Sequence, residues 1–139
     1  MMTKTLNRSL QLSTLLAVLL VAVPVMAKPI HPYAEPIALG DEAIDIGEIL
    51  ATALQPTPWT LVKENDALYL GELSYRGFDV QSRITVVENV LTLTLDSITE
   101  TGCGENCKNV DAKRALNWLV SLRRSITYEL TLRVRDSLQ

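Results

Sequence analysis

Apolar residues along the chain follow two different spacings, and the change between them falls at Pro56 and Pro58. Before these prolines the apolar positions recur at roughly helical spacing, which predicts a first helix that begins near Asp41. Asp41 is placed to cap this helix, and Glu42 and Asp45 put negative charge where the helix dipole favours it. The prolines then end the helix. Its apolar residues are Ile44, Ile46, Ile49, Leu50 and Leu54.

After the prolines the apolar period falls to about two, which predicts an antiparallel meander of four β-strands. Tight turns are expected at Asn65-Asp66, Arg76-Gly77 and Glu88-Asn89. One face of such a sheet is rich in leucine, isoleucine and valine, while the other carries threonine, arginine and glutamine. The apolar face therefore needs a cover. The predicted strands span residues 59–64, 67–75, 78–86 and 91–96.

A second helical pattern near the end of the chain supplies this cover. It predicts a helix from Asp111 to Asp136, about 39 Å long, which is longer than a domain of this size is wide. Trp118 has the largest side chain of the apolar stripe, and we expect it in the core rather than in a ligand site. The stripe consists of Ala115, Trp118, Leu119, Leu122, Ile126 and Leu130.

Residues 126–136 also fit a different secondary structure. From Ile126 to Val134 apolar and polar residues alternate as in a strand, and threonine, tyrosine and valine favour β geometry. A strand here would lengthen the sheet at an edge, and no turn chemistry beyond Arg123-Arg124-Ser125 interrupts the preceding helix. The helix is preferred, and the strand stays open as the alternative.

The fold class predicted by these patterns is α+β: a single antiparallel four-stranded meander, with an N-terminal helix and a long C-terminal helix packed on one face. The length of the chain suits one compact domain, assigned to residues 41–139. Residues 28–40 hold Pro29, Pro32 and Pro36, a composition that favours an extended lead-in without a core.

The first 27 residues have the features of a cleaved secretory signal peptide. Lys4 and Arg8 precede an apolar run of about 14 residues, and small residues end at Ala27, where we expect cleavage. This run is shorter than the roughly 20 residues that span a bilayer, so no stable transmembrane anchor is expected. The predicted location is the periplasm or the exterior of the cell.

Charge is distributed unevenly along the exported chain. Residues 28–107 hold 4 basic and 13 acidic residues, whereas residues 108–139 hold 7 basic and 3 acidic ones. A nucleic-acid-binding domain normally has a basic surface without such an acidic body, so nucleic acid is not an expected partner. The basic end is interpreted either as a solvated helix face paired with the acidic body or as a contact for an anionic partner. The residues of that candidate surface are Arg123, Arg124, Arg133 and Arg135.

The only two cysteines, Cys103 and Cys107, lie close together between the last predicted strand and the last helix. Export to an oxidising compartment predicts a structural disulfide between them. Gly102 and Gly104 give the backbone the freedom that such a short ring needs. The alternative is a thiol–disulfide or metal-linked role, although the spacing differs from that of thioredoxin-type cysteines and two thiolates do not complete a zinc site.

Catalytic chemistry has little support in the sequence. The single histidine, His31, lies in the lead-in, which removes the usual general base from the domain. No phosphate-binding loop, nucleophile elbow or HExxH helix is present in the sequence. Carboxylates on or near strands remain candidates for acid–base work, but their positions are typical of solvent-facing sheet or turn residues. They are Glu72, Asp79, Glu88 and Asp96.

The series of apolar motifs resembles a group of small bacterial exported proteins and lipoproteins of unassigned function. The resemblance extends from Asp41 to Leu130 and includes Trp59-x-Leu61, the Arg76-Gly77 turn and Trp118-Leu119. It implies the order helix, antiparallel strands, helix, and a location in the Gram-negative envelope. It brings no catalytic residues and no cofactor. The chain differs from the lipoprotein members because no cysteine directly follows its signal.

Taken together, the sequence predicts an exported binding or accessory protein that is not an enzyme and needs no cofactor. Its contact surface would be either the arginine-rich helix end or the polar sheet face around Arg83, Thr85, Thr92 and Thr94. The expected partner is an envelope protein or an anionic surface.

Overall fold

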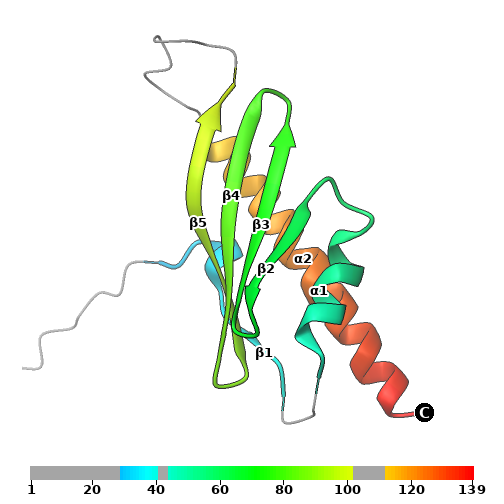
Figure 1. The fold of residues 1–139 in the computed structure, drawn as a ribbon. Coiled ribbons are helices and arrows are strands. Elements are labelled where there is room, and N and C mark those ends of the chain that lie inside the picture. Colours follow the sequence, from blue (N-terminus) through cyan, green and yellow to red (C-terminus); the bar gives the residue numbers. More distant parts are fainter. Residues whose placement is uncertain (1–28, 41–43, 102–111) are drawn as a thin grey trace, which may run out of the picture.

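An antiparallel five-stranded sheet and two α-helices make up the α+β fold of the computed structural model, which describes residues 29–40, 44–101 and 112–139 (Figure 1). The elements in chain order are the 3₁₀ turn η1 (Pro32–Ala34), β1 (Ile37–Ala38), α1 (Ile46–Leu54), β2 (Thr60–Asn65), β3 (Leu68–Tyr75), β4 (Phe78–Val87), β5 (Val90–Glu100) and α2 (Ala112–Ser137).

The four predicted strands are present as the meander β2 to β5. Its second and third turns lie where the sequence places them, whereas the first turn is Asp66-Ala67, one residue later than expected. Arg76 and Gly77 both have positive φ, at 50° and 81°, and so do Glu88 and Asn89, at 49° and 60°. Two successive residues of positive φ are typical of the tight hairpin turn that matches the twist of the flanking strands. The strand order is β1-β5-β4-β3-β2.

The prediction of four strands is wrong by one, because part of the lead-in joins the sheet. Ile37 pairs with Leu91 in β5, and the backbone N–H of Leu39 donates to the carbonyl of Asn89 at 2.8 Å. Ile37 and Leu39 are also buried in the core, which corrects the expectation that residues 28–40 contribute no core. A two-residue strand between prolines and a glycine has no periodicity of its own.

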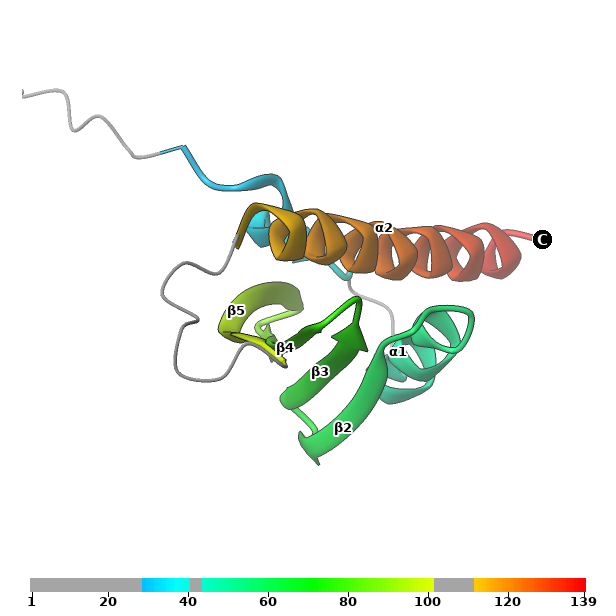
Figure 2. The same ribbon diagram turned by 90° about the horizontal axis from the view of Figure 1, so that it is seen from above.

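The core lies between the inner face of the sheet and α2, which crosses behind the strands (Figures 1 and 2). Ile84, Leu91 and Leu93 are the fully buried apolar residues of the sheet. They alternate with outward-facing threonines and arginine, as the period of two predicts. The buried residues of α2 are Ala115, Leu119, Leu122, Ile126 and Leu130.

The first helix begins later than the sequence suggests. Asp45 is the N-cap, and its carboxylate accepts a hydrogen bond from the backbone N–H of Glu48 at 3.1 Å. Asp41, the cap expected from the sequence, lies outside the described residues. The sequence placed Asp45 within the first turn, so the expected start of the helix was about one turn too early.

The end of α2 is helical rather than extended, which decides between the two structures considered for residues 126–136. Ile126 and Leu130 continue the buried stripe of the helix, so burial favours the 3.6-residue period over the alternation. The C-terminal half of α2 lies beside α1, and the two helices are in contact (Figure 2). No helix among the described residues is long and apolar enough to cross a bilayer.

The two isoleucines near the N-terminus test whether the lead-in is part of the core. Ile37 is 7% exposed and Ile30 is 62% exposed. We expect Ile37→Ala to lower the free energy of unfolding by about 2 kcal/mol, because it leaves a cavity in the core. Ile30→Ala, the matched control, should change it by less than about 0.5 kcal/mol. Chemical denaturation of both variants measures the difference, and equal stability would contradict the assignment of β1 to the core.

Candidate functional site

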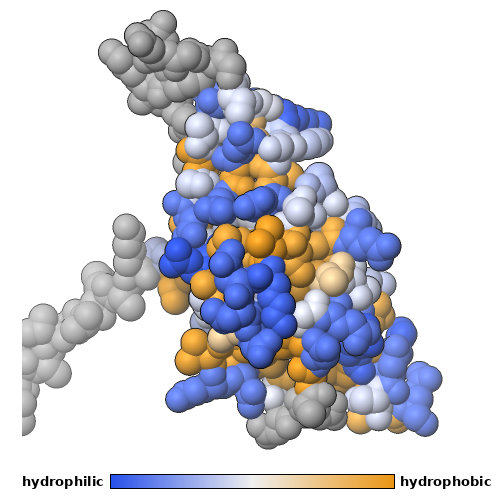
Figure 3. Space-filling model, viewed as in Figure 1, coloured by the Kyte–Doolittle hydropathy of each residue, from blue (hydrophilic) through white to orange (hydrophobic). Residues whose placement is uncertain are grey.

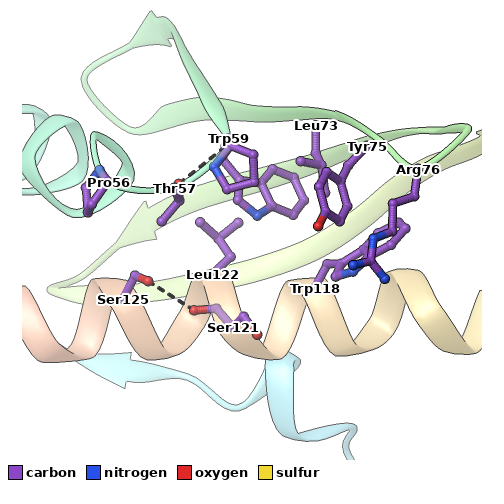
Figure 4. A pocket seen from close by; sticks show the side chains of 11 residues that line it. Pro56, Thr57, Trp59, Leu73, Tyr75, Arg76, Trp118, Ser121, Leu122 and Ser125 are labelled. Atoms are coloured by element: carbon purple, nitrogen blue, oxygen red, sulfur yellow. Dashed lines mark hydrogen bonds between the residues drawn. The ribbon is translucent and has the colours of Figure 1, made fainter.

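A groove with a cavity volume of about 390 Å³ opens between α2 and the end of β3, and the loop between α1 and β2 closes one end (Figure 4). We call it the aromatic groove. The sheet and its turn contribute Trp59, Leu73, Tyr75 and Arg76, α2 contributes Trp118, Ser121, Leu122 and Ser125, and the loop contributes Pro56, Thr57 and Pro58.

The floor of the groove depends on a close approach between the sheet and α2. Leu122 points from α2 toward Trp59 (Figure 4). A Cβ atom at Gly71 would lie 3.4 Å from the Trp59 ring and 3.6 Å from the Leu122 side chain. Both distances are ordinary van der Waals contacts, so the two side chains lie close to the backbone of β3 at this point. Thr57 fixes the loop. Its hydroxyl donates to the Leu54 carbonyl at 2.7 Å and accepts from the backbone N–H of Trp59 at 3.3 Å.

A series of ring contacts forms one end of the groove. The Tyr75 and Trp118 rings meet edge to face at 5.6 Å, and Trp118 meets Phe78 in the same manner at 5.7 Å. The Arg76 guanidinium lies over the Tyr75 ring, 5.1 Å from its centroid. These contacts hold Trp118 at the boundary of the core, where it is half-buried. The expectation that Trp118 belongs to the core and not to a ligand site is therefore only partly met.

The polar groups of the groove that have no partner among the described residues are the two indole N–H groups, the Arg76 guanidinium and the Tyr75 hydroxyl, of which only the hydroxyl can also accept. The hydroxyls of Ser121 and Ser125 donate to helix carbonyls one turn earlier, each at 3.2 Å. Neither the Trp59 nor the Trp118 indole N–H bonds to another described residue, and no buried side-chain nitrogen or oxygen among them lacks a partner. Figure 4 shows the Trp59 nitrogen on the side of the ring that faces α2.

Among the residues that the structure describes, Arg76 is the only charged one that lines the aromatic groove. No carboxylate of the described residues lies within ion-pair distance of its guanidinium. The groove thus combines an apolar floor with one cation in a chain that is acidic overall, with a formal net charge of −3.

The four arginines of the predicted anionic-partner surface do not share one environment. The Arg123 side chain donates to the carbonyl of Glu35 at 3.0 Å, and Arg135 pairs with the neighbouring Asp136 at 3.0 Å. Arg133 joins Glu48 of α1 at 2.9 Å and Glu129 at 3.3 Å. The hydrogen bonds to these two carboxylates raise the pKa of Arg133 above its ordinary value. Arg124 is exposed.

The carboxylates considered for acid–base work are accounted for by local partners or lie in a turn. Asp79 accepts a hydrogen bond from Ser74, and Glu72 accepts one from Gln81 at 3.2 Å. Asp96 pairs with Arg83 at 3.1 Å, which places part of the polar sheet face in an ion pair. Glu88 lies in the β4–β5 turn.

No candidate metal site was found in the described part of the chain, meaning no group of three or more His, Cys, Asp or Glu residues positioned to bind one. The ring nitrogen of His31 accepts from the Tyr33 N–H at 3.5 Å and caps η1. Cys103 and Cys107 lie outside the described residues, so the disulfide and the alternative thiol or metal role stay predictions.

Two further hollows have less to specify a ligand. One lies on the polar face of the sheet, has a volume of about 260 Å³ and contains Glu72 and Asp79, whose bonds are described above. The other, of about 490 Å³, lies between β1 and the end of α2. Its lining is aliphatic apart from two threonines and Arg135, which is already paired.

The face of the sheet opposite to α2 mixes apolar and polar side chains (Figure 3). Val62 and Leu70 are half-buried there, in the same cross-strand row as Arg83 and Thr94. This surface is exposed but has no concave apolar site comparable with the aromatic groove.

No protein-family model matches the chain, and no match was found among curated proteins or solved structures. Function is therefore argued from the geometry of the site.

Tryptophan emission tests the geometry of the groove, because both tryptophans of the chain line it. Trp59 is 7% exposed and Trp118 is half-buried, so acrylamide should quench mainly the emission of Trp118. In Trp118→Phe only Trp59 emits. We expect its acrylamide quenching constant to be severalfold lower than that of the unmodified protein, because the Trp59 ring is buried. Strong quenching of the remaining Trp59 would contradict its position in the floor.

Proposed function

We propose that this protein is a non-catalytic binding protein of the bacterial envelope, and that the aromatic groove is its ligand site. The observation that carries the proposal is the convergence of both tryptophans, Tyr75 and Arg76 on one apolar groove. Its volume of about 390 Å³ falls at the lower end of the ~300–1,000 Å³ typical of small-molecule sites.

The location in this proposal rests on the sequence of residues 1–27, which is typical of a cleaved export signal. The non-catalytic role rests on the chemistry of the groove lining. The lining contains hydroxyls that donate to backbone carbonyls, indole N–H groups and one guanidinium. None of the described residues that line the groove is a carboxylate, histidine or cysteine, so these residues include no general base of the usual kind to activate a nucleophile.

Exposed aromatic surface supports binding in a second way. Tyr75 is 38% exposed although it packs against Trp118. Tyrosine and tryptophan contribute a large contact area at a small cost in conformational entropy, which makes them effective in binding sites. The ring contacts also fix the orientation of Trp118 before any ligand arrives, and this preorganisation reduces the entropy lost on binding.

Removal of Trp118 tests the groove as a ligand site. The neutral fluorophore N-phenyl-1-naphthylamine emits more strongly in an apolar site, so its titration gives an affinity. We expect Trp118→Ala to weaken its binding about tenfold, because the wall of the groove loses a large aromatic surface.

The matched control is Tyr128→Ala, which removes another aromatic residue of α2 that is 64% exposed and does not line the groove. Its affinity should equal that of the unmodified protein. Trp118→Leu is a second variant that keeps an apolar side chain in the core boundary and removes only the ring. Circular dichroism checks that each variant is folded. Equal fluorophore affinity in all variants would reject the groove as the site.

A further inference from the structure

The groove has a direction, because its apolar and charged parts lie at different places along it. The loop residues Pro56 and Pro58 form one end, Trp59 and Leu122 form the floor, and Arg76 extends from the β3–β4 turn at the other end (Figure 4). A ligand that fills it would meet apolar surface along its body and a cation near its end.

Most of the polar groups that the groove offers to a ligand without a partner of their own are donors. The three serine and threonine hydroxyls donate to backbone carbonyls within the protein. The two indole N–H groups and the Arg76 guanidinium have no hydrogen-bond or ion-pair acceptor among the described residues. The Tyr75 hydroxyl, also without a partner there, can both donate and accept. The only charged group among them is the guanidinium, which favours an acceptor with negative charge.

From this arrangement we propose that the aromatic groove binds a small amphiphilic carboxylate, with an apolar or aromatic body over Trp59 and Leu122 and its carboxylate at Arg76. This inference rests on the proposed function and names the ligand class of the same site.

Arg76 is held where it can act in this way. It sits in a tight turn at a φ of 50°, next to Gly77, and its guanidinium lies over the Tyr75 ring. A cation that stacks on a ring keeps its N–H edge free for a planar acceptor, and the guanidinium fork matches a carboxylate with two parallel hydrogen bonds. Arg76 is therefore the specificity-determining residue of the proposal.

Because the protein is acidic, few other basic residues compete with Arg76 for an anionic ligand. The exported residues 28–107 hold 13 acidic residues against 4 basic ones, and Arg76 is one of these four. Of the other described basic residues in this range, Lys63 pairs with Asp66 at 2.7 Å and Arg83 pairs with Asp96 at 3.1 Å. Within the described residues of this range, the cation without an ion-pair partner therefore lies at the aromatic groove.

Three ligands of nearly equal shape separate the roles of charge and apolar surface: 4-phenylbutyrate, neutral 4-phenylbutanamide and cationic 4-phenylbutylamine. Their affinities are measured by tryptophan fluorescence and by calorimetry on the protein without residues 1–27. We expect the carboxylate to bind about fivefold more tightly than the amide at low salt, and the amine to bind more weakly than the amide. High salt should reduce the preference, because Arg76 is exposed and screened.

Arg76→Gln should remove the preference, so that the carboxylate binds no more tightly than the amide. Arg124→Gln is the matched control, since it removes the same charge from an exposed arginine that does not line the groove. The preference should persist in that variant.

Each other outcome rejects a defined part of the account. Equal affinity for carboxylate and amide in the unmodified protein would overturn the anionic ligand class and leave the groove as an apolar site. A preference that survives Arg76→Gln would overturn the role of Arg76. If the carboxylate and the amide both fail to bind while N-phenyl-1-naphthylamine binds, the ligand class is wrong. If N-phenyl-1-naphthylamine also fails to bind, the proposed function fails as well.

Discussion

The packing of one helical stripe against one sheet face is the interaction on which the structure depends. Leu119, Leu122 and Ile126 of α2 are fully buried, as are Ile84, Leu91 and Leu93 of the sheet. A sheet with a single apolar face is not stable without a cover, and α2 supplies nearly all of it. The short helix α1 and strand β1 then close the two sides of this core, with Ile49 and Leu50 from α1 and Ile37 from β1.

The aromatic groove is a consequence of the same packing. Leu122 belongs both to the buried stripe and to the groove floor, so the position of α2 sets the distance between the walls. Trp118, one turn earlier, lies at the boundary of the core and is oriented by Tyr75 and Phe78. The ion pair between Arg133 and Glu48 links α2 to α1 at the other end of the helix. Most arginines of the described chain thus act within the fold, whereas Arg76 faces a ligand-sized space.

The sequence predicts the elements that have a period and misses those that depend on distant partners. The meander, its Arg76-Gly77 turn and the long helix follow from local spacing and turn chemistry. β1 has two residues and is defined by its pairing with β5, and no local sequence pattern predicts this pairing. The groove combines residues 56–59, 73–76 and 118–125, so it exists only after folding. Its one signal in the sequence is the placing of the two tryptophans, with Trp59 at the start of the first strand pattern and Trp118 near the start of the apolar stripe of the last helix.

Hydrogen exchange followed by nuclear magnetic resonance tests the dependence on α2 most directly. The backbone amides of Leu119 and Leu122 should exchange as slowly as that of Ile84, because the helix and the sheet can lose their shared core only by global unfolding. The free energy of opening measured at all three amides should equal the free energy of unfolding from denaturation. Exchange of the two helix amides through an opening far less costly than that of Ile84 would show that α2 leaves the sheet on its own, and would contradict the account.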